Sequence, residues 1–114
     1  MTSKKRVSAQ AKKPASSKRA KPPRACDYTR TFLKDWGRLS RSGRYDLNRL
    51  KEAMLLLIGN DALLGPEWLD HALKGDWADH RECHIGGDFL LIYRFESNTI
   101  IFVRAGTHSD LFED

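Results

Sequence analysis

Four histidines in the C-terminal half of the chain are the side chains best suited to chemistry: His71, His80, His84 and His108. Histidine is the side chain that most readily exchanges protons near pH 7. RNA can be cut without a metal if one group removes the 2′-hydroxyl proton, another protonates the leaving 5′-oxygen, and the charge on the phosphate is stabilised. Two or three histidines and a carboxylate suffice. Spacing alone does not show that the rings converge, so surface histidines without a catalytic role remain the alternative.

A metal site is another use of the same residues. His80 and His84 have the HxxxH spacing that binds zinc when it lies on a helix. The Gly86-Gly87 pair that follows predicts a β-hairpin, and therefore a strand. On a strand, residues four apart lie about 13 Å from one another, too far for zinc bonds of about 2.0–2.3 Å. A metal-binding regulator built on this pair is the less favoured hypothesis, and Cys83 is predicted to be a small buried residue.

Three tryptophans and one phenylalanine could stack on nucleic-acid bases. Trp36 lies on the apolar face of a predicted helix and is assigned to the core. Trp68 and Trp77 lie in predicted loops, where a tryptophan more often holds its loop against the domain. Phe112 follows His108 by four residues and lies beyond the last predicted strand, with little core to join. We expect it to stack on a base.

Two amphipathic helices must support these residues. A short extended stretch over 24–28 comes first, and Thr29 is the predicted N-cap of a helix that runs to about residue 40. A second helix runs from residue 45 or 46 to residue 58. Ser42-Gly43 and Gly59-Asn60 end the two patterns. The apolar residues of each helix fall on one face: Phe32, Leu33, Trp36 and Leu39 in the first, and Leu47, Leu50, Met54, Leu57 and Ile58 in the second.

The second half of the domain has the pattern of an antiparallel sheet. Strands are predicted at 72–73, 81–85, 88–95 and 99–104, followed by 105–107 leaving the sheet and one helical turn at 108–112. Helices followed by a meander predict an α+β fold, in which the two N-terminal helices pack on one face of a small antiparallel sheet. The other face is then free to carry a site.

The charge of the chain is divided unevenly. Residues 1–25 hold nine Lys or Arg and no acid, whereas the rest of the chain holds eleven basic and fifteen acidic side chains. We expect a disordered basic tail over 1–24, because it has almost nothing to bury, and one domain over 25–114. Such a tail attracts polyanions without sequence preference; a solubilising extension, or a start codon chosen too early, is the alternative.

Composition excludes several classes of protein. No run of about 18 apolar residues is present, so no membrane span is expected. No apolar segment follows the basic N-terminus, which therefore does not have the pattern of a secretory signal. With only two cysteines, Cys26 and Cys83, we expect a reduced cytoplasmic protein and no disulfide framework.

Three segments together resemble one family, the YafQ-type toxins of the RelE/ParE superfamily. LDHALKGDW, residues 69–77, resembles their DHxLxGxW stretch. RECH and DFLLIY, residues 81–84 and 88–93, resemble their RDxH…DWxLIY segment. RAGTHSDLF, residues 104–112, is similar to their RTGTHxxLF ending. The resemblance covers about residues 25–112 and implies a RelE/ParE-like fold.

The resemblance implies a toxin of a type II toxin–antitoxin system. Such a toxin enters the A site of the 70S ribosome and cuts mRNA there. A 2′-hydroxyl of the mRNA attacks the adjacent phosphate. A cognate antitoxin binds the toxin and blocks it. No cofactor and no metal are expected. The resemblance places the catalytic group at His71, His84, Asp88 and His108, and it implies that His108 is the general acid. It places the RNA contacts at Arg104, Phe112 and Phe89.

The chain departs from the family pattern at a few positions. Phe89 replaces a tryptophan, Glu82 replaces a common aspartate, and the hairpin carries Gly86-Gly87. The basic tail is also unusual, and we expect it to supply the cationic contact that an acidic domain lacks for ribosomal RNA. Two other functions remain open: a ParE-like toxin that inhibits DNA gyrase without this histidine set, and an inactive homologue that only binds its antitoxin.

Overall fold

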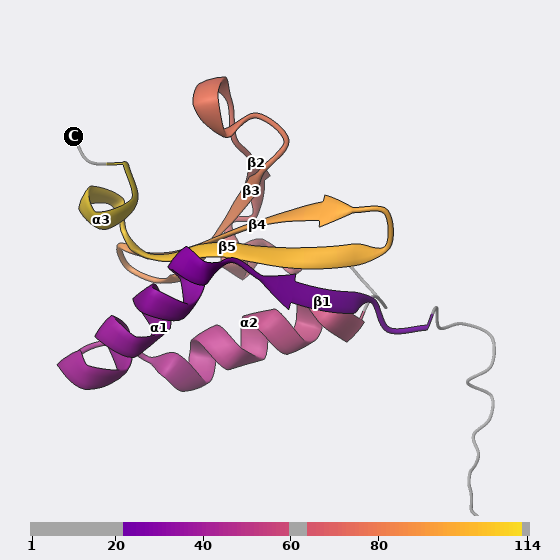
Figure 1. The fold of residues 1–114 in the computed structure, drawn as a ribbon. Coiled ribbons are helices and arrows are strands. Elements are labelled where there is room, and N and C mark those ends of the chain that lie inside the picture. The colour runs from indigo at the N-terminus through magenta and orange to yellow at the C-terminus, as the bar shows by residue number, and fades with distance from the viewer. Residues whose placement is uncertain (1–21, 60–63, 113–114) are drawn as a thin grey trace, which may run out of the picture.

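The computed structural model describes residues 22–59 and 64–112, which form one five-stranded sheet with helices on both sides (Figure 1). The strands, in the sheet order β1-β5-β4-β3-β2, are β1 (Ala25–Tyr28), β2 (His71–Ala72), β3 (Arg81–Gly86), β4 (Phe89–Glu96) and β5 (Thr99–Thr107). The predicted α+β fold is confirmed. The sheet is mixed and not wholly antiparallel as predicted, because β1 pairs with β5 in parallel while the other neighbours are antiparallel. The expected disordered tail lies almost wholly outside the described residues, and so does the predicted stop at Asn60.

Two helices follow β1 and lie together on one side of the sheet (Figure 1): α1 (Arg30–Ser42) and α2 (Leu47–Gly59). The predicted N-cap of α1 is confirmed, since the Thr29 side chain accepts a hydrogen bond from the Phe32 amide at 2.9 Å. Gly43, with φ of 69°, ends α1 in the left-handed region that glycine tolerates best. At the start of α2, the Asp46 carboxylate accepts from the Arg49 amide at 3.0 Å.

The main core fills the space between these helices and the sheet. It holds large buried side chains from both layers, including Phe32, Leu39, Leu50, Leu57, Ile85, Phe89, Leu91, Tyr93, Ile100 and Phe102. Each such side chain contributes about 1.5–3 kcal/mol when it is fully buried. Cys83 is buried here as predicted, and burial raises the pKa of its thiol to about 12. Trp68 is 2% exposed and Trp36 packs against the same cluster, which agrees with the expected packing roles.

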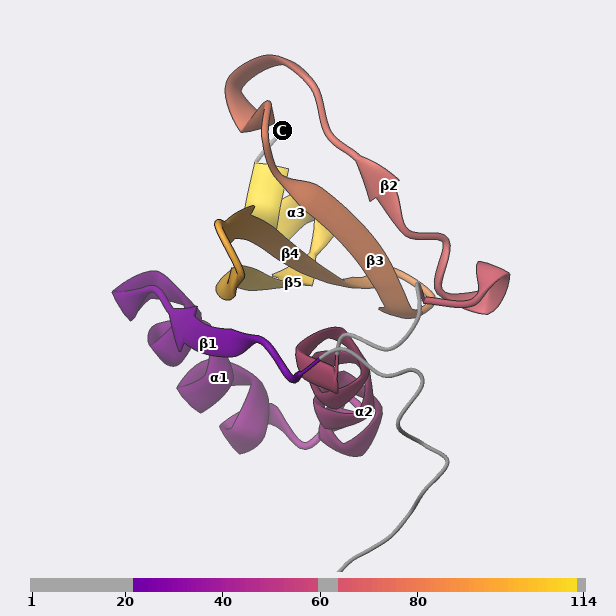
Figure 2. The same cartoon turned by 90° about the vertical axis from the view of Figure 1, so that its right-hand side faces the viewer.

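A smaller cluster covers the opposite face of the sheet. Leu90 and Ile92 of β4 are buried there beneath Leu111 of the short helix α3 (His108–Phe112). Partly buried Phe112 and Trp77 pack against this cluster, and Figure 2 shows the segment between β2 and β3 arching toward α3. The expectation that Phe112 has little core to join is therefore wrong.

Strand β5 is longer than predicted. Residues 105–107 stay in the sheet opposite 89–91, whereas the sequence predicts that they leave it. An irregularity in the pairing at Ile92/Tyr93, opposite Val103, shifts the register, and the strand then continues with Ala105 fully buried in the main core. The strand therefore delivers the chain directly to His108, the first residue of α3.

The hairpin between β3 and β4 turns one residue later than predicted. β3 continues to Gly86, with an irregularity in pairing between His84 and Gly86, and the turn consists of Gly87 and Asp88. Gly87 has φ of 54°, which glycine adopts at little cost. Asp88 therefore stands at the tip of the hairpin, where its side chain is not held by the alternation of a strand.

A buried tyrosine anchors the segment that leads into β2. The Tyr93 hydroxyl lies 2.7 Å from both carboxylate oxygens of Asp70, and the Arg81 Nε lies 3.3 Å from the same carboxylate. Burial raises the pKa of Tyr93, so its hydroxyl remains a donor. Asp70 immediately precedes His71, so this contact fixes the backbone that carries the first candidate histidine.

Replacing Tyr93 by phenylalanine tests this anchor. Tyr93→Phe removes the hydroxyl donor and leaves the Asp70 carboxylate to Arg81, which we expect to lower the free energy of unfolding by about 1.5–3 kcal/mol. Thermal unfolding followed by circular dichroism measures the change. Tyr28→Phe is the control, because the Tyr28 side chain is 51% exposed. Equal melting temperatures for the Tyr93→Phe protein and the parent would contradict the anchor.

Candidate active site

Three histidine rings form a row on the face of the sheet opposite α1 and α2. The ring centres of His71 and His84 lie 6.1 Å apart, and those of His84 and His108 lie 6.3 Å apart. The three residues come from β2, β3 and α3, so the fold brings together positions far apart in the sequence. His80 stands outside the row, where its ring packs on the edge of Trp77. Rings about 6 Å apart can contact different oxygens of one phosphate group.

Glu82 joins this row, although the sequence indicates it only as a variant of an aspartate. Its side chain is 5% exposed, and its Oε2 lies 3.3 Å from His71 Nε2 and 3.5 Å from His84 Nε2. A buried carboxylate is costly unless it is paired. The alternation of β3 is the signal that could have found it, because Glu82 and His84 share one face while Cys83 faces the core.

Both ring nitrogens of His71 face oxygen atoms that can only accept a hydrogen bond. Nδ1 lies 2.8 Å from the Leu69 carbonyl oxygen, and Nε2 faces the Glu82 carboxylate. The two contacts hold the ring in one orientation. Leu69 itself adopts φ of 49°, a left-handed conformation that costs a leucine about 1–2 kcal/mol. In this conformation the Leu69 carbonyl oxygen contacts His71 Nδ1.

His108 is oriented by Asp88 from the tip of the β3–β4 hairpin. The Asp88 Oδ1 accepts from the His108 backbone amide at 3.3 Å and contacts the ring Nδ1 closely. A carboxylate that binds Nδ1 keeps a proton there and leaves Nε2 to give or take another. The hydrogen bond from the His108 side chain holds the pKa of Asp88 below its usual range, so the carboxylate stays ionised at neutral pH.

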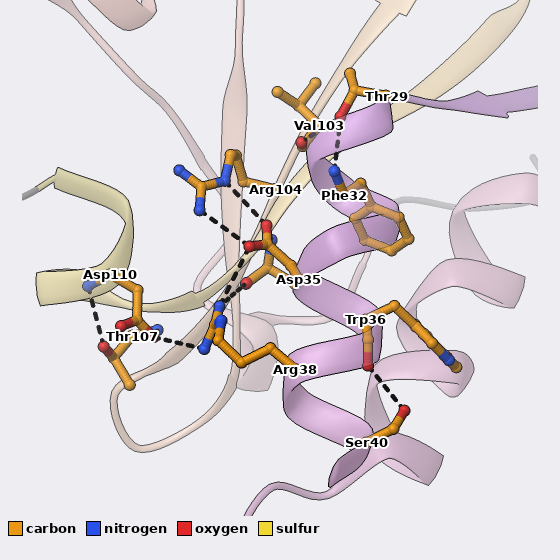
Figure 3. Close-up of polar contacts among 11 residues, drawn as sticks. Thr29, Phe32, Asp35, Trp36, Arg38, Ser40, Val103, Arg104, Thr107 and Asp110 are labelled. Carbon is orange, nitrogen blue, oxygen red and sulfur yellow. Dashed lines mark hydrogen bonds and ion pairs between the residues drawn. The ribbon is translucent and has the colours of Figure 1, made fainter. Parts of the chain in front are cut away.

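Arg104, which is expected to contact RNA, forms an ion pair with Asp35 of α1. Its Nε and one terminal nitrogen each lie 2.9 Å from an oxygen of Asp35, as Figure 3 shows. Asp35 is 3% exposed and also accepts from the Ala105 amide at 3.1 Å. Asp35 therefore occupies one of the two-pronged faces of the guanidinium, and the RNA contact of Arg104 stays a prediction. The sequence separation of 69 residues gives no local signal for this pair.

The two phenylalanines expected to contact RNA lie on opposite faces of the sheet. Phe89 is 4% exposed, and its ring centre lies 5.1 Å from that of Tyr45 in the main core. The alternation of β4 puts this position on the side of the helices, so the expected RNA contact of Phe89 conflicts with its burial. The Phe112 ring centre lies 5.9 Å from that of His108, and its ring is edge-on to Trp77. Phe112 therefore forms one wall of the site.

The arrangement offers two kinds of chemistry. Histidine rings beside carboxylates can transfer protons or contact a phosphate group. The same face could also hold a transition metal, because ligand atoms of His71, Glu82 and His84 all lie within 4.8 Å of one another. Two imidazoles and a carboxylate suit zinc or copper. Within residues 22–59 and 64–112 this is the one group of three such ligands, and it includes His84 but not His80, the other member of the less favoured HxxxH pair.

Comparison with known proteins places this arrangement in a family. The model of the YafQ family, a bacterial toxin of type II toxin–antitoxin systems, matches residues 24–113. The chain is 37% identical over 89 residues to the mRNA interferase toxin YafQ of Escherichia coli K12, which covers 78% of this chain and 96% of that protein. No helix of the described chain is long and apolar enough to cross a membrane.

Solved structures agree. YafQ in the E. coli DinJ-YafQ complex superposes with a TM-score of 0.70 at 37% identity, covering 78% of this chain and 98% of that one. A copper-bound mutant toxin from Helicobacter pylori superposes with a TM-score of 0.71 at 38% identity, covering 78% and 99%. The family model spans the sheet, both long helices and every histidine of the row. This chain belongs to the YafQ family of bacterial toxins of type II toxin–antitoxin systems.

Proposed function

We propose that this protein is an mRNA interferase, an endoribonuclease toxin that cuts mRNA on the ribosome and is held inactive by a cognate antitoxin. The observation that carries the proposal is the row of His71, His84 and His108, flanked by two carboxylates. The similarity to a toxin named mRNA interferase supports it, and so does the solved complex of a relative with DinJ. Its substrate would place it in the cytoplasm.

The proposed reaction uses the donors and acceptors in the row. The 2′-hydroxyl oxygen attacks the adjacent phosphorus as its proton passes to a base, and the bond to the 5′-oxygen breaks as an acid protonates that oxygen. The products are a 2′,3′-cyclic phosphate and a 5′-hydroxyl. His108 is the general acid, its Nδ1 held by Asp88 and its Nε2 presented to the leaving oxygen. His84 takes the proton and His71 binds the phosphate oxygens, which stabilises the pentacovalent charge.

Removing the proposed acid is the direct test. His108→Ala should abolish growth arrest and mRNA cleavage while the protein remains folded and still binds its antitoxin. Mapping of mRNA 5′ ends after induction in a bacterium measures cleavage, and codon-phased cuts are expected for the parent protein. Full toxicity of the His108→Ala protein would overturn the mechanism. Intact mRNA together with inhibited supercoiling would favour a toxin that inhibits gyrase. Intact mRNA in a protein that only binds its antitoxin would favour an inactive homologue.

Helix α1 offers a surface for ribosomal RNA. Four exposed cations recur every three or four residues along it, Arg30, Lys34, Arg38 and Arg41, and its one acid, Asp35, is buried. At 100° per residue these cations fall on one face of the helix. Among these four cations, the described part of the chain provides ion-pair partners for Arg38, which lies beside Asp35 and Asp110. The acidic balance of the domain therefore conceals a basic face, which supplements the contact expected from the tail.

Neutralising this face tests the ribosome contact. Arg30→Gln, Lys34→Gln and Arg41→Gln together should flatten the dependence of ribosome affinity on salt by about 2–3 units of log K per log salt, since each phosphate contact contributes about 0.7–0.9. The control combines Lys51→Gln, Lys74→Gln and Arg94→Gln, which remove three cations from other elements. Equal salt slopes for the two triple variants would contradict a contact through α1. Deleting residues 1–21 measures the share of the tail.

A metal ion bound to the row would interfere with this reaction. It would take the Nε2 atoms of His71 and His84 and an oxygen of Glu82, so these nitrogens could not handle protons or bind phosphate. The copper-bound H. pylori relative motivates this part of the proposal.

Metal addition and removal test the relation between the two uses of the site. We expect cleavage to persist in EDTA, to fall when Cu²⁺ is added, and to recover after chelation. Glu82→Gln should weaken the inhibition, because a neutral amide is a poorer ligand than a carboxylate. Isothermal titration with Cu²⁺ gives the affinity directly. Loss of cleavage in EDTA would show that the chemistry requires a metal.

A further inference from the structure

Asp110 lies two residues after the proposed acid, at a position that the motif RTGTHxxLF leaves open. It forms a reciprocal pair of hydrogen bonds at the start of α3. Its Oδ2 accepts from the Thr107 amide at 3.0 Å, and its own amide donates to the Thr107 hydroxyl at 3.2 Å. This is a capping box, with Thr107 as the N-cap and an aspartate at the third helical position. His108 is enclosed between the two residues of the box.

A second contact ties Asp110 to α1. Arg38 Nη1 lies 3.3 Å from Asp110 Oδ2, and Arg38 Nη2 lies 3.2 Å from Asp35 (Figure 3). Asp35 in turn binds Arg104 of β5. Four alternating charges therefore connect β5, α1 and α3: Arg104, Asp35, Arg38 and Asp110. We call this set the charge chain.

The backbone of β5 is shaped to admit the charge chain. A Cβ atom at Gly106 would lie 3.1 Å from Asp110 Oδ2 and 3.3 Å from Arg38 Nη2. Both distances are tighter than ordinary van der Waals contact, so a side chain at position 106 would push the pair apart. Glycine at this position leaves the space in which Asp110 and Arg38 meet.

Helix α3 depends on these contacts for its position. It has five residues, far fewer than an isolated helix needs to be stable in water. Its apolar anchors, Leu111 and Phe112, lie near its C-terminal end, where they pack on the smaller cluster. Its N-terminal end, which carries His108, is held by the capping box, by Arg38 and by Asp88.

We propose that Asp110 is a positioning residue for His108, acting through the Thr107 capping box and the Arg38 ion pair. The proposal rests on the proposed function, because it assigns His108 the role of acid. Hydrogen bonds from Thr107 and the charge of Arg38 hold the pKa of the Asp110 carboxyl below its usual range, so the group is ionised at neutral pH. Asp110 does not touch the reacting atoms. It sets the angle at which the His108 ring meets Asp88 and the phosphate.

Steady-state cleavage of mRNA on programmed ribosomes by the full chain separates positioning from binding. Asp110→Ala should lower kcat about tenfold or more with little change in KM, because small displacements of a catalytic group are costly. Asp110→Asn keeps an oxygen for the Thr107 amide and should restore most of the rate. Arg38→Gln should act in the same direction as Asp110→Ala, with a smaller effect. In the ring ¹⁵N spectrum, the Asp110→Ala protein should show His108 released from Asp88.

The matched control is Asp46→Ala, which removes a comparable side-chain cap from α2, a helix without a candidate catalytic residue. It should lower the melting temperature and leave kcat unchanged. If Asp110→Ala and Asp46→Ala lower kcat in proportion to their loss of stability, the positioning role is overturned. A fully active Asp110→Ala protein beside an inactive His108→Ala protein overturns it too, while the proposed function stands. An active His108→Ala protein overturns both.

Discussion

Asp35 brings a carboxylate from α1 to the outer edge of β5, where the side chain is 3% exposed. It accepts hydrogen bonds from Nε and one terminal nitrogen of Arg104, from Arg38 and from the Ala105 amide. A buried charge that loses its partner costs about 3–5 kcal/mol. The relative position of α1 and β5 therefore has little freedom. The position of the residues that follow Ala105, including α3 and the proposed acid His108, therefore depends on this contact.

The two faces of the sheet divide the work of the domain. Residues on the helix side of β3 and β4, such as Ile85 and Phe89, are buried in the main core. The opposite face has a small apolar cluster and the row of histidines, whose side chains remain accessible in part. Because neighbouring positions along a strand alternate between these faces, Glu82 and His84 can be functional while Cys83 between them is inert.

Local signals in the sequence predict much of this architecture. The Thr29 cap, the end of α1 at Gly43 and the last helical turn depend on neighbouring residues, so they could be read from the chain. The convergence of the histidines rested on resemblance and not on spacing. Asp35 with Arg104, Glu82 with His71 and the continuation of β5 through Ala105 depend on residues distant in sequence, which no local pattern encodes. The burial of Phe89 conflicts with its expected RNA contact, because an aromatic residue beside a site can face either side of a strand.

The contact between α1 and β5 has a consequence for association. Beyond Phe102, where β1 ends its pairing, side chains of α1 and its cap take the place of a neighbouring strand: the Thr29 hydroxyl donates to the Val103 carbonyl, Asp35 accepts from the Ala105 amide, and Arg38 lies 3.5 Å from the Ala105 carbonyl. The outermost strands of the sheet have four and two residues. On the β1 side, the described residues therefore offer another chain little unpaired backbone, which blocks edge-to-edge growth there, the usual route from exposed strands to aggregates. On the other side β2 pairs only with Arg81 and Glu82 of β3.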